Sequence, residues 1–189
     1  MPKPAVIDND FLSHLGDLNN HSNAFDIILK FFTELDYKVF MHPFVYKYEM
    51  HPDLNNPLVM KLFEEGVITV PDLSEVLNGK SGGKTYYELI VKKIYKEFTG
   101  KAFPSIKVCD EWKSRVSLGE AHSAAMCVFM DCNYLLSDDN DAVRYLGKVT
   151  KRATQKFIHV YNRQDCCDFL RKSGKMSRKE LKLIGHKAK

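Results

Sequence analysis

Short apolar runs and helically spaced apolar positions alternate along the first fifty residues. Residues 5–7 and 37–41 are apolar runs short enough for buried strands. Between them, residues 23–35 place apolar side chains three and four apart, which predicts a helix with one buried face. A new element is expected to start at Pro43 and to run to Met50.

The middle of the chain, residues 51–116, has the pattern of helices throughout. Two short helices are predicted at 58–65 and 73–77, and a longer one at 85–98. Thr85 and Glu88 have the spacing of a capping box at the start of that longer helix. We therefore expect an enlarged helical insertion here.

Strands and helices alternate again towards the C-terminus. A helix is predicted at 117–130, a strand at 133–136, a helix near 142–146, a strand at 157–161, and two basic helices at about 163–187. Strands alternating with helices favour a mainly parallel sheet with helices on both faces. The fold class expected is α/β, built as one domain over residues 1–189 with three α/β/α layers.

The amino-acid composition indicates which class of protein to expect and leaves the expected fold class as it is. Apolar residues make up 44% of the 189 residues and charged residues 28%, which is typical of a globular protein. No apolar run reaches the about 18 residues of a membrane span, and no signal peptide is evident, so a cytoplasmic protein without membrane contact is expected. Five cysteines without zinc-type spacing predict reduced, mostly buried thiols.

Charge is distributed unevenly. Residues 1–143 carry 14 basic and 21 acidic side chains, whereas residues 144–189 carry 14 basic and 3 acidic ones. An acidic body joined to a basic last quarter indicates a polyanionic partner near a site rich in carboxylates, although a solvated lysine-rich tail is the plain alternative.

Residues 78–85, NGKSGGKT, nearly match a phosphate-binding loop but lack its first glycine. The residues before them also look helical rather than strand-like. A glycine-rich connector is the better interpretation.

Acidic side chains follow two of the predicted strands and occur in two helical segments. Asp8 follows the first strand, and Asp138 and Asp139 follow the strand at 133–136; Glu49 ends the segment that begins at Pro43, and Glu120 lies in the first turn of the helix at 117–130. The carboxyl ends of parallel strands share one edge of the sheet, so these acids are expected to converge there.

Converging carboxylates repel each other unless a cation joins them. Oxygen ligands without His or Cys favour Mg²⁺ or Mn²⁺, either of which can activate water for attack on a phosphodiester.

Each acid also has a structural alternative. Asp8 or Asp10 could cap the next helix, Ser117 and Glu120 have capping-box spacing, and residues 138–141 could form a capping turn. The functional interpretation therefore depends on the ordered set of acids.

Four blocks of the sequence resemble the pattern of PIN-domain nucleases, a family that includes bacterial ribonuclease toxins of the VapC type. The blocks are VIDNDFLSHL, HPFVYKYEM, LGEAHSAAMC and YLLSDDNDAVRYL, and the closing CCDFLRKSGKMSRKELK resembles the last helices of bacterial members. Asn9 and Glu120 depart from the family's commoner residues, and 51–116 has no counterpart in the pattern.

The resemblance implies a metal-dependent endoribonuclease with Mg²⁺ or Mn²⁺ as cofactor. It implies Asp8, Glu49, Glu120 and Asp138 as catalytic ligands, with Asp139 assisting at the metal, and Asn9, Asp10, Ser137 and Asp141 orienting ligands or water. Contacts to the RNA backbone are expected from Lys148, Lys151, Arg152 and Lys156. Tyr86, Tyr87 and Trp112 could stack on bases, although core packing is the better interpretation for each.

Three functions remain open at this stage. The first is the toxin of a toxin–antitoxin or defence system, with an antitoxin protein and a second copy of the chain as partners. The second is a PIN-like scaffold without nuclease activity, and the third is a housekeeping RNA-processing nuclease.

Overall fold

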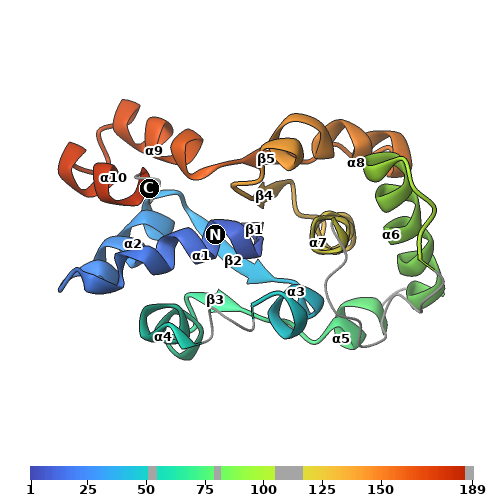
Figure 1. The fold of residues 1–189 in the computed structure, drawn as a ribbon, viewed down its shortest axis with the longest axis horizontal. Helices are drawn as coiled ribbons and strands as arrows, with labels where there is room; N and C mark the ends of the chain where they lie inside the picture. The colour runs from blue at the N-terminus through green and yellow to red at the C-terminus, as the bar shows by residue number, and fades with distance from the viewer. Residues whose placement is uncertain (51–54, 79–81, 105–116, 186–189) are drawn as a thin grey trace.

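The computed structural model describes residues 1–50, 55–78, 82–104 and 117–185. Five strands form one all-parallel sheet in the order β3-β2-β1-β4-β5 (Figure 1). The strands are β1 (Lys3–Ile7), β2 (Tyr37–Met41), β3 (Ile68–Thr69), β4 (Tyr134–Leu136) and β5 (His159–Tyr161). The expected α/β class with a parallel sheet is confirmed, and the arrangement is compatible with three α/β/α layers.

Helices connect successive strands and cover both faces of the sheet (Figure 1). They are α1 (Asn9–Gly16), α2 (Ala24–Glu34), α3 (Pro43–Tyr48), α4 (Pro57–Glu64), α5 (Leu73–Asn78), α6 (Gly83–Thr99), α7 (Leu118–Phe129), α8 (Gly147–Thr154), α9 (Arg163–Lys172) and α10 (Arg178–Gly185), with a 3-10 turn η1 (Asp17–Asn20) and a π-helical segment η3 (Ala142–Leu146).

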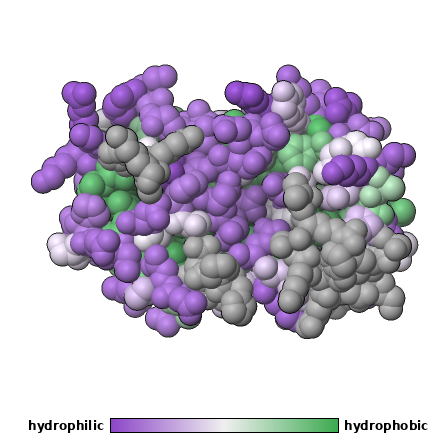
Figure 2. Space-filling view, viewed as in Figure 1, coloured by the Kyte–Doolittle hydropathy of each residue, from purple (hydrophilic) through white to green (hydrophobic). Residues whose placement is uncertain are grey.

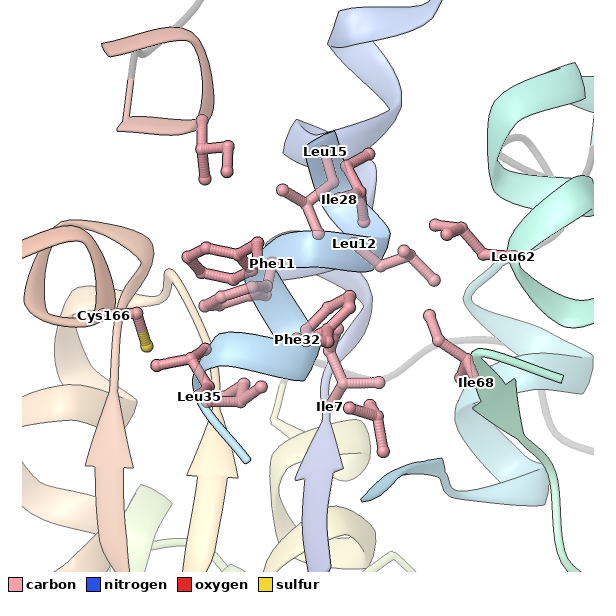
Figure 3. Packing of buried hydrophobic residues seen from close by; sticks show 14 of the residues in the cluster. Ile7, Phe11, Leu12, Leu15, Ile28, Phe32, Leu35, Leu62, Ile68 and Cys166 are labelled. Carbon is pink, nitrogen blue, oxygen red and sulfur yellow. The ribbon is translucent and has the colours of Figure 1, made fainter. Parts of the chain in front are cut away.

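Alternate strand residues supply two separate hydrophobic cores. Ala5 and Ile7 of β1 face a core formed with α1, α2, α4, α9 and α10, part of which is seen in Figure 3. Val6 faces a second core formed mainly with α6, α7 and α8. This period of two, with both faces buried, explains why the strands read as continuous apolar runs.

Several predicted boundaries are corrected by the structure. Residues 51–116 include the strand β3, which adds to the edge of the sheet beside β2, because Ile68 is buried there and pairs with Val39. Helix α6 begins at Gly83, after Gly82 with φ +68°, so the capping box expected at Thr85 does not start it.

No helix in the described part of the chain is long and apolar enough to cross a membrane. The cysteines in that part are all free and buried, as predicted; they are Cys127, Cys132, Cys166 and Cys167. Cys109 and Trp112 lie outside the described residues, as does part of the glycine-rich loop.

Most of the face seen in Figure 2 is hydrophilic, with apolar side chains restricted to patches.

Candidate active site

The strand register brings distant acids to one edge of the sheet. Ile7, the last residue of β1, pairs with Met41 of β2 and with Leu136 of β4. The chain positions that follow these three strand ends therefore lie side by side at the carboxyl edge. They are Asp8, His42 and Ser137.

Asp8 is buried at this edge, with an exposed fraction of 4%. Its Oδ1 accepts a hydrogen bond of 3.0 Å from the backbone N–H of Asn9, and it occupies the N-cap position of α1. Burial raises its pKa well above the usual range, and the charges of Glu120, Asp10 and Glu49 raise it further. Asp8 therefore caps a helix and also belongs to an acidic cluster.

Glu49 reaches the same cluster from the end of α3, where it is the C-cap residue. Its carboxylate accepts a hydrogen bond from the backbone N–H of Gly119. A Cβ atom at Gly119 would overlap that carboxylate, so only glycine leaves room for it. Burial, and then the charge of Glu120, raise the pKa of Glu49 to about 7.

Glu120 lies in the first turn of α7, next to Gly119. The N-cap residue Ser117 makes no capping hydrogen bond through its side chain, so the structural alternative of a capping box is wrong. The pKa of Glu120 is raised to about 7, mainly by burial and further by the charges of Asp139 and Asp10. Its carboxylate accepts a hydrogen bond from its own backbone N–H, and an acid held among other acids in this way is a candidate ligand.

Asp10 and Asp139 extend the cluster towards β4. Asp10 accepts hydrogen bonds from the Ser137 hydroxyl at 3.3 Å and from the Phe11 backbone at 2.8 Å. Its pKa is raised, chiefly by burial. Asp139 accepts a hydrogen bond of 2.7 Å from the backbone of Ala142, so the predicted capping turn forms.

Asp138 lies near Asp10, whose pKa its charge raises, but its own carboxylate is paired with a cation. Its carboxylate forms an ion pair with the buried Arg163, whose backbone N–H also donates to it at 2.9 Å, and His14 Nδ1 lies 2.9 Å away. An Asp at the end of a strand needs a positive partner when it is buried, and Arg163 supplies it. Sequence reasoning missed Arg163, although a cation directly after the strand β5 was a usable signal.

Three buried polar side chains near the acidic residues are linked to one another by hydrogen bonds. Tyr87 of α6 is 2.7 Å from His42 Nε2 and 2.7 Å from His122 Nδ1. His42 Nδ1 accepts the N–H of Phe44, so its Nε2 carries the proton and donates to the Tyr87 oxygen, which can then donate to His122.

Burial lowers the pKa of both imidazoles, that of His122 to about 3, so both are neutral. These three hydrogen-bonded side chains join α6 to the start of α3 and to helix α7, which bears Glu120.

The chemistry of the edge fits a hard divalent cation. Asp8, Glu49 and Glu120 offer carboxylate oxygens, and the buried Oδ1 of Asn9 has no hydrogen-bond partner among the described residues. A cation would supply that partner and would offset the mutual repulsion of the acids. In the described ranges, no group of three or more His, Cys, Asp or Glu side chains could hold a metal ion as it is placed.

The predicted RNA-binding cations differ in their surroundings. Arg152 forms an ion pair with Glu97 at 3.2 Å. Lys156 donates a hydrogen bond to Asp131 at 2.8 Å, and because Lys156 precedes β5 it lies at the opposite end of that strand from the acids. Lys148 and Lys151 are exposed on α8. Tyr87 is fully buried, as the core-packing interpretation predicts, whereas Tyr86 is 55% exposed, so that interpretation is wrong for Tyr86.

Asp141 is exposed. The expected ligands and orienting residues that follow the ends of β1 and β4 lie at the carboxyl edge; they are Asp8, Asn9, Asp10, Ser137, Asp138 and Asp139. Comparison of the chain with protein-family models, with curated proteins and with solved structures finds no match.

Proposed function

We propose that the chain is a metal-dependent endoribonuclease that hydrolyses RNA phosphodiester bonds. The observation that carries the proposal is the convergence of Asp8, Glu49 and Glu120 from three separate elements. Burial, and then the charges of neighbouring acids, raise the pKa values of Asp8 and Glu49 at the carboxyl edge of a parallel sheet. Perturbed acids at such an edge are typical of catalytic sites.

In this proposal Asp8, Glu49 and Glu120 hold Mg²⁺ or Mn²⁺, and Asn9 Oδ1 and Asp10 or Asp139 complete the polar environment. A bound ion would lower the pKa of a water molecule and stabilise charge on the phosphate. Asp138 remains a predicted ligand, but its ion pair with Arg163 also suits a role in holding the end of β4 and the start of α9 in position.

The PIN-like identity of the fold is part of the same proposal. The sheet order, the acids after β1 and β4, and the acids at the end of α3 and the start of α7 all support it. The toxin role, an antitoxin partner, a homodimer and a cytoplasmic location stay predictions from the resemblance.

The test is incubation of the purified chain with RNA in Mg²⁺ or Mn²⁺, compared with EDTA. Wild type should cleave only with metal, and Asp8→Asn and Glu120→Gln should lower the rate by about 100-fold or more. Glu64→Gln, an exposed acid on α4, is the matched control and should cleave like wild type. Equal cleavage by wild type and Asp8→Asn would show that the acidic side chains take no part in the reaction.

A folded wild type that cleaves no RNA in either metal would favour the scaffold alternative instead.

A further inference from the structure

A hollow of about 360 Å³ lies between α9 and α10, outside the acidic cluster. Arg171, Arg178 and Lys182 line it, together with one acid, Asp168. Arg171 pairs with Asp168 at 2.8 Å, whereas Arg178 and Lys182 have no ion-pair partner among the described residues. The lining therefore carries a net charge of +2 at neutral pH, an arrangement that favours a bound anion.

The cations stand on well-anchored helices. Asn162 and Asp165 form a capping box at the start of α9. At the start of α10, Glu180 accepts the N–H of Ser177 at 2.8 Å and also pairs with Lys30 of α2 at 3.0 Å. Because both helices are held by caps and by buried apolar faces, the cationic groups converge on the hollow without a folding step on binding.

The hollow adjoins the carboxyl edge that bears the acids. The side chain of Arg163 bonds Asp138 through Nε and donates through Nη1 to the carbonyl of Ile184 at 2.8 Å. Ile184 precedes Gly185, which lines the hollow. The guanidinium group of Arg163 thus links the last turn of α10 to Asp138 at the end of β4, and Figure 1 shows α9 and α10 together at one end of the molecule.

We infer that the α9–α10 hollow binds a backbone phosphate of the RNA chain, beside the edge where the chain is cleaved. The inference rests on the proposed function for the choice of RNA. Guanidinium groups match the geometry of phosphate oxygens and bind them through paired hydrogen bonds. An acidic site repels RNA, so a nearby cationic site is needed to hold the substrate against it.

Binding of a fluorescent 12-nucleotide single-stranded RNA, measured by anisotropy in EDTA, tests the inference without cleavage. The variant carries Arg178→Gln and Lys182→Gln, both at exposed positions. The control carries Lys92→Gln and Lys93→Gln on α6, at the far end of the molecule in Figure 1, and has the same net charge as the variant.

We expect the variant to bind about tenfold more weakly and its log–log salt slope to fall by about 1.4, at about 0.7 for each lost phosphate contact on a single strand. The control should stay within about twofold of wild type. Equal weakening in variant and control would overturn the inference, since net charge alone would then explain binding.

Two further ligands separate the sources of the anion. If a hexaglutamate peptide loses affinity in the variant while RNA does not, the hollow binds an acidic protein and the inference fails. If inorganic phosphate binds wild type but RNA affinity is unchanged in the variant, the RNA assignment fails as well. If the variant loses RNA affinity while wild type cleaves no RNA, the proposed function fails and the phosphate site stands.

Discussion

Replacing Glu120 by Gln should stabilise the metal-free protein above neutral pH. The Glu120 carboxylate is largely buried next to Asp139 and Asp10, which raise its pKa together with burial. Glutamine keeps the shape of the side chain and removes the charge. The difference in unfolding free energy between this variant and wild type therefore measures how much the acidic cluster destabilises the protein when no cation offsets its charge.

The magnitude follows from the pKa of Glu120. A rise from 4.5 to about 7, at about 1.4 kcal/mol per unit, corresponds to about 3.5 kcal/mol, which the partial exposure of the side chain to water reduces to about 2–3 kcal/mol. The folded state holds the proton more tightly than the unfolded state, so stability is greatest below pH 4.5 and falls as the pH rises to about 7. Above that pH the loss is complete.

Urea denaturation in EDTA at pH 8 and at pH 4.5 measures this effect. Glu120→Gln should exceed wild type by about 2–3 kcal/mol at pH 8 and should come within about 0.5 kcal/mol of it at pH 4.5, where Glu120 is neutral in the folded state and about half ionised in the unfolded state. Glu64→Gln on α4 is exposed and should change stability by no more than about 0.5 kcal/mol at either pH.

Divalent metal should narrow the difference in stability between Glu120→Gln and wild type. Ten times the dissociation constant of Mg²⁺ or Mn²⁺ would stabilise wild type by about 1.4 kcal/mol, and the variant by less because it has lost a ligand. A Glu120→Gln protein that is no more stable than wild type at pH 8 in EDTA would refute the account of a mutually repelling cluster.

Three other substitutions test neighbouring parts of the site. Tyr87→Phe removes the hydroxyl between two buried imidazoles and should cost about 2–4 kcal/mol in urea denaturation; no loss would mean that the imidazoles find other partners. Gly119→Ala should displace the Glu49 carboxylate and abolish metal-dependent cleavage while the far-ultraviolet circular dichroism stays unchanged, and full activity would contradict the close approach. Arg163→Met leaves Asp138 buried without its cation and should cost about 3–5 kcal/mol, of which a second change, Asp138→Asn, should restore a part; a single variant as stable as wild type would argue against the buried pair.

The apolar pattern predicted most elements because burial on both faces leaves a continuous signal. β2 has the predicted bounds, α7 is one residue shorter than predicted at each end, and β4 begins one residue later than predicted. β3 was missed because it is only two residues long, and pairing with β2 rather than local sequence makes it a strand.

Caps were predicted less well than elements. Asn23 and Ser117 occupy N-cap positions, but neither makes a capping hydrogen bond through its side chain. Capping depends on a local rotamer and on competing partners, which the order of residues does not specify.

The sequence by itself determined the α/β class, the parallel sheet and the presence of acids after β1 and β4, since these follow from local periodicity and from where strands end. Only the tertiary structure decided the partner of each acid. Glu49 meets Gly119 and Glu120, whereas Asp138 meets Arg163, which follows the neighbouring strand β5. Charges interact through space over a few ångströms, so their pairing is fixed by packing and not by separation along the chain.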